Sequence, residues 1–196
     1  MSRSSLLKKE RQKILIEKIK EDPFLTDDDL AEMLSVSVPT IRLDRLELGI
    51  PELRERIKAV AENNHRKVKT LQSKEIIGEL IDISLGREGV SILETDDSMA
   101  FEKTKIIRGH FIYSLAESLA IALIDADVVL TGLANIKFKR PVTVGEKLVA
   151  KGEVIRKRRN QHVVLVETRV GNENVFRGKF SVFAVDPARI PGGTKE

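Results

Sequence analysis

The chain has 196 residues, of which 41% are hydrophobic, so it can bury the cores of one medium domain and one small one. It has no cysteine, which excludes a disulfide framework and a cysteine-based zinc site, and its net charge of +4 is modest although Lys and Arg cluster locally. No targeting or transmembrane segment is recognisable, so we expect a cytoplasmic protein without a membrane partner.

Residues 1–50 predict a small all-α domain. Apolar residues at helical spacing over 7–22, followed by a proline, predict a first helix. Thr26 is placed to cap a second helix, and the three aspartates after it suit the positive end of the helix dipole. After a short turn, Ser37 caps a third helix with Pro39 in its first turn.

A tight turn between the second and third helices matches a helix-turn-helix. We expect the third helix to direct Ile41, Leu43 or Leu46, and Leu48 toward the core. Arginine side chains can contact guanine edges or phosphates, and Ser and Thr hydroxyls can contact bases or phosphates. Cations that flank the helices add salt-dependent phosphate contacts. The side chains expected to contact a double-stranded DNA operator are Ser37, Thr40, Arg42 and Arg45, together with Lys8, Lys9 and Arg11. The alternative is an ordinary three-helix unit whose arginines are merely solvated.

Residues 51–67 predict an amphipathic linker helix. Leu53, Ile57, Val60 and Ala61 form one apolar stripe, which must be buried somewhere. We favour a linker that docks in two places and so couples two domains. The alternative is a helix that simply caps the DNA-binding domain.

Residues 68–187 predict a second domain in which strands surround one apolar helix. Residues 108–124 are apolar on most sides, which is typical of a buried helix. Two strands are expected within 76–94, before that helix, and four long ones after it. The class is therefore α+β, and residues 188–196 are expected to form a tail without fixed structure.

An antiparallel sheet around a buried helix resembles the hot-dog fold, and IKFKRPVTVGEKLVAKGEV is similar to acyl-CoA thioesterases of that fold. The segments TIRLDRLEL, IPELRERIK, IIRGH and LTGLANIKF resemble the FapR family of bacterial repressors of fatty acid and phospholipid synthesis. This resemblance extends from about residue 10 to residue 185. It implies a homodimer that is not an enzyme and has no cofactor. Malonyl-CoA or malonyl-acyl carrier protein would be the effector, and its binding would release the helix-turn-helix from the operator.

In that family the positions matching Phe101, Arg108, Gly109 and Leu130 line the acyl pocket. The chemistry agrees, because the buried carboxylate of a malonyl thioester must be paired and an arginine can bind it with two hydrogen bonds. Instead of contacting the ligand, Arg108 could form an ion pair at an interface. Phe101 and Leu130 could simply pack in the core. Candidates for the coenzyme A phosphates are Lys139, Arg140 and the run 156–159.

One position departs from the family, which commonly has Asn on the central helix where this chain has Glu117. We favour an ion pair between Glu117 and Arg108 in the ligand-free protein. A shifted ligand preference or retained hydrolysis stays open, since acids on this helix serve as base or nucleophile in hot-dog thioesterases. The competing functions are therefore a thioesterase with an accessory DNA-binding domain and a repressor whose hot-dog domain only dimerises. Three histidines without ligand spacing predict no metal site.

Overall fold

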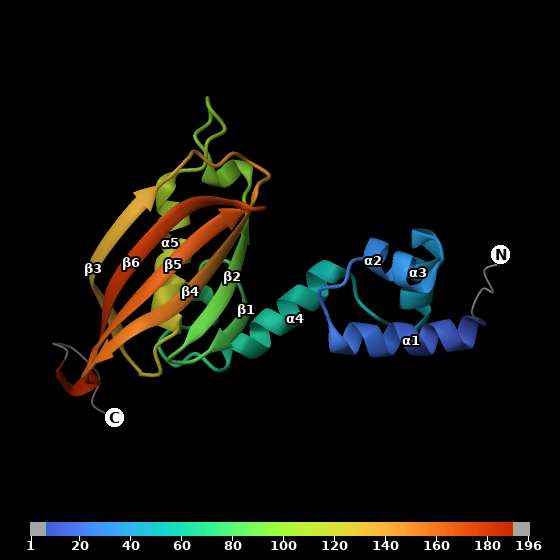
Figure 1. The fold of residues 1–196 in the computed structure, drawn as a ribbon, viewed down its shortest axis with the longest axis horizontal. Helices are drawn as coiled ribbons and strands as arrows, with labels where there is room; N and C mark the ends of the chain where they lie inside the picture. The colour runs from blue at the N-terminus through green and yellow to red at the C-terminus, as the bar shows by residue number, and fades with distance from the viewer. Residues whose placement is uncertain (1–6, 190–196) are drawn as a thin grey trace. The chain divides into compact units, whose positions relative to one another are not determined.

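The computed structural model describes residues 7–189 and divides the chain into two compact units, separated between Val60 and Ala61 (Figure 1). Apart from its first two residues, which end the 3₁₀ turn Pro187–Arg189, the tail expected at 188–196 lies outside the described residues. Within the described part of the chain, no helix is long and apolar enough to span a bilayer.

The first unit contains the three expected helices, α1 (Lys8–Glu21), α2 (Asp27–Leu34) and α3 (Val38–Glu47). Thr26 caps α2 as expected, because its hydroxyl accepts from the N–H of Asp29 at 3.1 Å while the Asp29 carboxylate accepts from the N–H of Thr26 at 2.8 Å. A left-handed residue, Ser35, ends α2 and opens the turn to α3.

The side of α3 that faces the core differs in part from the one expected. Ile41 is fully buried as expected, but Leu43 and Leu46 are both exposed. The buried positions beside Ile41 are instead taken by the charged residues Asp44 and Arg45, which are 1% and 5% exposed. The inner face of α3 is therefore held by ionic contacts as well as by apolar packing.

The expected linker forms helix α4, which spans Leu53–His65. Arg54 and Lys58 are exposed as predicted, whereas Arg56 is buried. The division between the two units falls inside this helix.

The second unit is a six-stranded antiparallel sheet in the order β1-β2-β4-β5-β6-β3. Its strands are β1 (Glu79–Ser84), β2 (Glu88–Glu94), β3 (Val129–Phe138), β4 (Lys147–Arg158), β5 (Gln161–Val170) and β6 (Glu173–Ala184). The sheet curves around helix α5 (Gly109–Ala122), which contacts every strand from β2 to β6 (Figure 1). The register of β1 against β2 shifts between Leu80 and Asp82.

Helix α5 lies close to the sheet because two glycines face it. Gly89 of β2 pairs with Gly152 of β4, and a Cβ on Gly152 would lie 2.9 Å from Leu123 Cδ1. Leu115 and Leu119 of α5 are almost fully buried in the same core. A buried helix enclosed by an antiparallel sheet is the hot-dog arrangement, so the expected α+β class is confirmed.

Candidate functional site

Three of the residues expected to contact DNA lie at the surface near the beginning of α3. Ser37 and Arg42 are exposed and Thr40 is half-buried. The hydroxyl oxygens of Ser37 and Thr40 lie 2.9 Å apart, and Arg42 Nε lies 3.5 Å from the carboxylate of Asp27. All three are accessible to a ligand approaching α3 from outside, and their contact with DNA stays a prediction.

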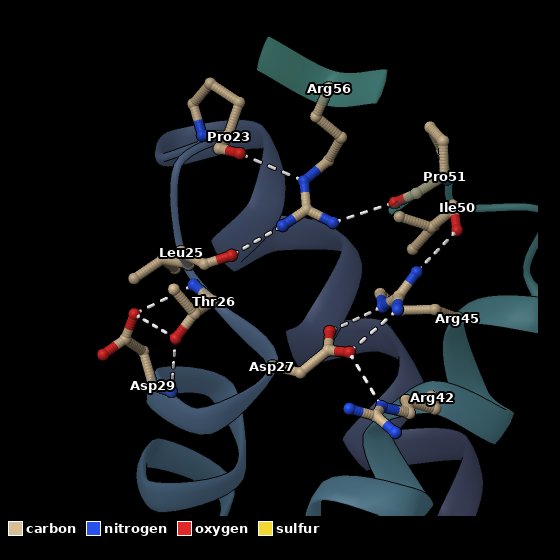
Figure 2. Close-up of polar contacts among 10 residues, drawn as sticks. All are labelled: Pro23, Leu25, Thr26, Asp27, Asp29, Arg42, Arg45, Ile50, Pro51 and Arg56. Carbon is tan, nitrogen blue, oxygen red and sulfur yellow. Dashed lines mark hydrogen bonds and ion pairs between the residues drawn. The ribbon is translucent and has the colours of Figure 1, made fainter. Parts of the chain in front are cut away.

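Arg45 does not share that surface, which corrects the expectation that it contacts DNA. Its Nε and Nη2 donate to the two carboxylate oxygens of Asp27 at 2.7 and 2.9 Å, and Nη1 donates to the carbonyl of Ile50 at 3.3 Å (Figure 2). The hydrogen bonds from Arg45 hold the pKa of Asp27 below its usual value although burial opposes this, and Arg42 adds to the effect. Arg45 is thus an internal anchor between α2 and α3.

Arg11 also faces α3, where it is half-buried, and its contact with DNA stays a prediction. Its Nε and Nη2 donate to the Asp44 carboxylate at 2.6 and 3.2 Å. Burial alone would raise the pKa of Asp44, but hydrogen bonds from Arg11 and then Gln12 hold it below its usual value. The other two predicted cations, Lys8 and Lys9, are exposed; Lys8 forms a surface ion pair with Glu47 at 2.7 Å.

Sequence analysis missed Arg56. Its guanidinium donates to the carbonyl oxygens of Pro23, Leu25 and Pro51, as Figure 2 shows, and it has no carboxylate partner among the described residues. Burial and then the nearby Arg45 lower the pKa of Arg56. The first half of α4 is therefore fastened to the first unit. No local sequence signal distinguishes this arginine from its solvated neighbours.

In the second unit, Arg108 lies at the N-terminus of α5. Its Nη2 donates to the carbonyl of Ser98 at 2.6 Å, Nε donates to that of Met99 at 3.3 Å, and the guanidinium lies 5.0 Å from the centre of the Phe111 ring. The side chain is half-buried, and Nη1 has no hydrogen-bond partner within residues 7–189. Arg108 forms no ion pair with a described carboxylate, so within one protomer the ion-pair alternative finds no support.

Gly109, the first residue of α5, faces an aromatic side chain that the sequence analysis did not select. A Cβ added to Gly109 would lie 3.2 Å from Cζ of Phe138, the last residue of β3. The Phe138 ring meets Phe176 edge-on at 5.1 Å and is itself partly exposed. Phe101 lies on the loop before α5 and is also exposed. Exposed aromatic groups thus accompany Arg108 at this end of the sheet.

Glu117 is not the partner of Arg108, so the favoured interpretation of this acid is wrong. Glu117 instead acts on Tyr113, one helical turn earlier: burial first, and then Glu117, raise the pKa of Tyr113. The nine residues from Arg108 to Glu117 correspond to about 13 Å of helix rise, which is too far for an ion pair.

Leu130 is the one predicted pocket residue that a single protomer keeps apart from the others. It lies near the start of β3 and pairs with Phe183, whereas Phe138, beside Gly109, ends that strand. Eight residues of strand separate the two positions by about 26 Å.

Within residues 7–189 no group of three or more His, Asp and Glu side chains could hold a metal ion.

Comparison with known proteins finds relatives that match both the helical first unit and the sheet-containing second unit. Residues 106–176 match the family model of the thioesterase superfamily. The chain is 60% identical to transcription factor FapR of Caldanaerobacter subterraneus subsp. tengcongensis over 91% of its length and 90% of that protein. It is 48% identical to transcription factor FapR of Bacillus cytotoxicus over 90% of its length and 91% of that protein.

Among solved structures, an uncharacterized protein, PH1136 from Pyrococcus horikoshii, matches 60% of the chain and 92% of its own length, with 32% identity and a TM-score of 0.56. Cj0977, a virulence protein from Campylobacter jejuni, matches 65% of the chain and 92% of its own length, with a TM-score of 0.60. Its 21% identity supports the fold alone.

Proposed function

The chain belongs to the FapR family of transcription factors, and from this premise we propose that a malonyl thioester is the effector that releases it from DNA. It is a DNA-binding transcriptional repressor of fatty acid biosynthesis genes and not an enzyme. The thioesterase alternative is set aside because the curated relatives are regulators despite their shared hot-dog domain. Control of phospholipid genes and action in the cytoplasm belong to the same proposal.

The observation that carries the effector proposal is the incomplete hydrogen bonding of the Arg108 guanidinium. Its guanidinium is positioned by two carbonyls and keeps Nη1 free of any partner in the described part of the chain. A malonyl carboxylate would supply the missing acceptor, and the N-terminus of α5 favours an anion in addition. Acetyl-CoA lacks that carboxylate and would leave the cation unpaired, which is the basis for selectivity.

A homodimer is proposed because one protomer leaves the site incomplete. Strand β3 is an edge of the sheet, and its exposed apolar side chains include Leu133 and Phe138. Antiparallel pairing of two β3 strands would bring Leu130 of the partner subunit toward Arg108, since these positions belong to opposite ends of the strand. The family's pocket residues would then come from both copies.

The same dimer supports the run 156–159 as a phosphate-binding segment. Arg158 pairs with Gln161 in the β4–β5 hairpin, and Gln161 pairs with Phe183 beside Leu130. The four basic residues are exposed and form no ion pair within the described residues. Arg140, by contrast, is occupied by Glu146 and Glu173, so it is the weaker candidate.

Helix α4 is the proposed connection between effector and DNA. Arg56 fastens its first half to the first unit, and Asn64 fastens its last turn to the second unit by donating to the carbonyls of Leu80 and Ile81 at 3.1 and 2.7 Å. We propose that the ligand orders the loop at 101–108 and thereby favours a released arrangement of the DNA-binding units. Reversing a 1:99 population to 99:1 requires roughly 5.5 kcal/mol of differential binding.

The test is a gel shift on a palindromic operator, titrated separately with malonyl-CoA, acetyl-CoA and succinyl-CoA. The proposal expects release by malonyl-CoA at a dose at least about tenfold below that of acetyl-CoA, because a charged hydrogen-bonded pair contributes more than about 1.4 kcal/mol. Equal doses of all three would reject the carboxylate as the recognised group. Release by malonyl-acyl carrier protein is then measured on the same duplex.

A further inference from the structure

The outward face of α3 carries two exposed leucines where a solvated helix would be polar. Leu43 is 62% exposed and Leu46 is 75% exposed, while the charged residues Asp44 and Arg45 occupy the inner face. Exposing leucine forgoes the gain from burial, and burying ions carries a desolvation penalty. A helix that breaks the usual pattern on both faces indicates that its outer face serves an external ligand.

The residues around the two leucines indicate what that ligand is. Leu43 and Leu46 are three residues apart, so they share one side of α3, and helical periodicity puts Pro39 and the exposed Arg42 on that side too. The hydroxyl of Ser37 lies at the beginning of the same helix. An apolar centre with a cation and a hydroxyl suits the DNA major groove, where the thymine C5-methyl is the apolar group among hydrogen-bonding edges and phosphates.

We propose that Leu43 and Leu46 are specificity-determining residues that contact thymine methyl groups in each operator half-site. This rests on the proposed function, in the sense that α3 must be the helix that enters the major groove. A second copy of the chain is the other conceivable occupant of an apolar face. The adjacent cation and hydroxyl favour DNA, because Arg42 would meet an identical Arg42 or an apolar surface in a symmetric contact.

The experiment removes one methyl group at a time. Duplexes are first selected from a random-sequence pool by the full-length chain. Each thymine of a selected operator is then replaced singly by deoxyuridine, which lacks only the methyl, and binding is measured by fluorescence anisotropy. We expect one or more thymines in each half-site at which deoxyuridine weakens binding about fourfold, the effect of one buried methylene-sized group.

Protein variants connect those thymines to the two side chains. Leu43→Ala and Leu46→Ala should each weaken binding to the thymine duplex and abolish the deoxyuridine penalty at its own position. Both side chains are exposed, so the thermal unfolding midpoint should not fall. Leu7→Ala is the matched control, because Leu7 is 72% exposed in the same unit but lies outside α3, and it should leave every penalty unchanged.

The inference is overturned if no thymine shows a penalty, or if the penalties persist in both variants. It is also overturned if either variant changes the sedimentation mass and leaves DNA affinity intact, since the face would then join two copies. Arg42→Gln distinguishes contact of α3 with DNA from contact of the two leucines with thymine. If it weakens binding while the leucine variants do not, α3 contacts DNA without the leucines; if it has no effect either, the placement of α3 itself fails.

Discussion

Asp27 and Arg45 form a two-point ion pair, with hydrogen bonds of 2.7 and 2.9 Å, between the first residue of α2 and the inner face of α3. Two parallel hydrogen bonds fix the guanidinium plane as well as its position. Because Asp27 also lies 3.5 Å from Nε of Arg42, the same carboxylate restrains an arginine on the outer surface. The helix-turn-helix geometry thus depends on an acid that the sequence analysis assigned only to the helix dipole.

Replacing that acid should destabilise the first unit. Asp27→Asn leaves the buried Arg45 cation without its counter-charge, and breaking a buried pair in this way typically costs about 3 kcal/mol. Hydrogen exchange of the amides in α2 and α3 of the full chain measures the change. Asp28→Asn is the control, since Asp28 is exposed beside it, and equal effects of the two variants would contradict the role of the pair.

The same carboxylate predicts a pH dependence of stability. The pKa of Asp27 is lowered in the folded chain by hydrogen bonds from Arg45 against the effect of burial. Its contribution is therefore fully present above the unfolded pKa of about 3.9 and is lost as pH falls through the lower folded pKa. An acid titration of the exchange rates in the first unit should show a smaller loss below about pH 4 in Asp27→Asn than in the parent. Parallel acid profiles would refute the assignment.

Arg56→Lys should loosen the attachment of α4 while keeping the charge. An ammonium cannot reproduce the planar set of donors that reaches Pro23, Leu25 and Pro51, so at least one carbonyl loses its partner. We expect about 1.5–3 kcal/mol less protection of the amides in 53–60 against hydrogen exchange. Arg54→Lys, an exposed substitution on the same helix, should change protection by less than about 0.5 kcal/mol. If both variants are equally protected, Arg56 is not the attachment.

Arg108→Gln should separate effector response from DNA binding. Loss of a charged hydrogen-bonding partner should raise the half-releasing dose of malonyl-CoA about 10- to 100-fold, while operator affinity without effector stays unchanged. A gel shift with titrated malonyl-CoA measures both quantities. Arg169→Gln is the control, because Arg169 is an exposed arginine on the outside of β5. An unaltered dose in Arg108→Gln would remove this residue from the site.

Gly109→Val should give a repressor that no longer responds to its ligand. The added Cβ would already lie 3.2 Å from the Phe138 ring, so a branched side chain must displace that ring and occupy the space beside Arg108. We expect normal operator binding that malonyl-CoA does not reverse, with Gly109→Ala intermediate. Release of the valine variant at the wild-type dose would show that this space is not used by the effector.

Sequence patterns predicted most of the fold because its elements depend on local rules. Thr26 and Pro39 mark helix starts by capping and by fixed φ, and the apolar run at 108–124 identifies α5 without any tertiary information. The four long strands after α5 follow from alternation and turn residues. These signals involve neighbours within a few positions, so the sequence alone contains them.

The orientation of α3 and the role of Arg56 could not be predicted in this way. Leu43 and Leu46 fit a core face as well as a surface face, and the choice depends on partners far away in sequence, Arg11 for Asp44 and Asp27 for Arg45. The separation of Leu130 from Arg108 likewise appears only once β3 has a direction and a register. Long-range pairing thus determines where the functional side chains point and which of them come together. The local pattern determines only whether each residue lies in a helix or a strand.

The register shift between Leu80 and Asp82 has a consequence for assembly size. If two copies join through β3, the combined sheet still ends in two β1 strands that pair with no further strand among the described residues, and such edges are natural starting points for further chain addition. Each is only six residues long and its hydrogen-bond ladder is interrupted by that shift. A short, irregular border is a poor template for another strand, so growth should stop at two copies instead of continuing into fibres.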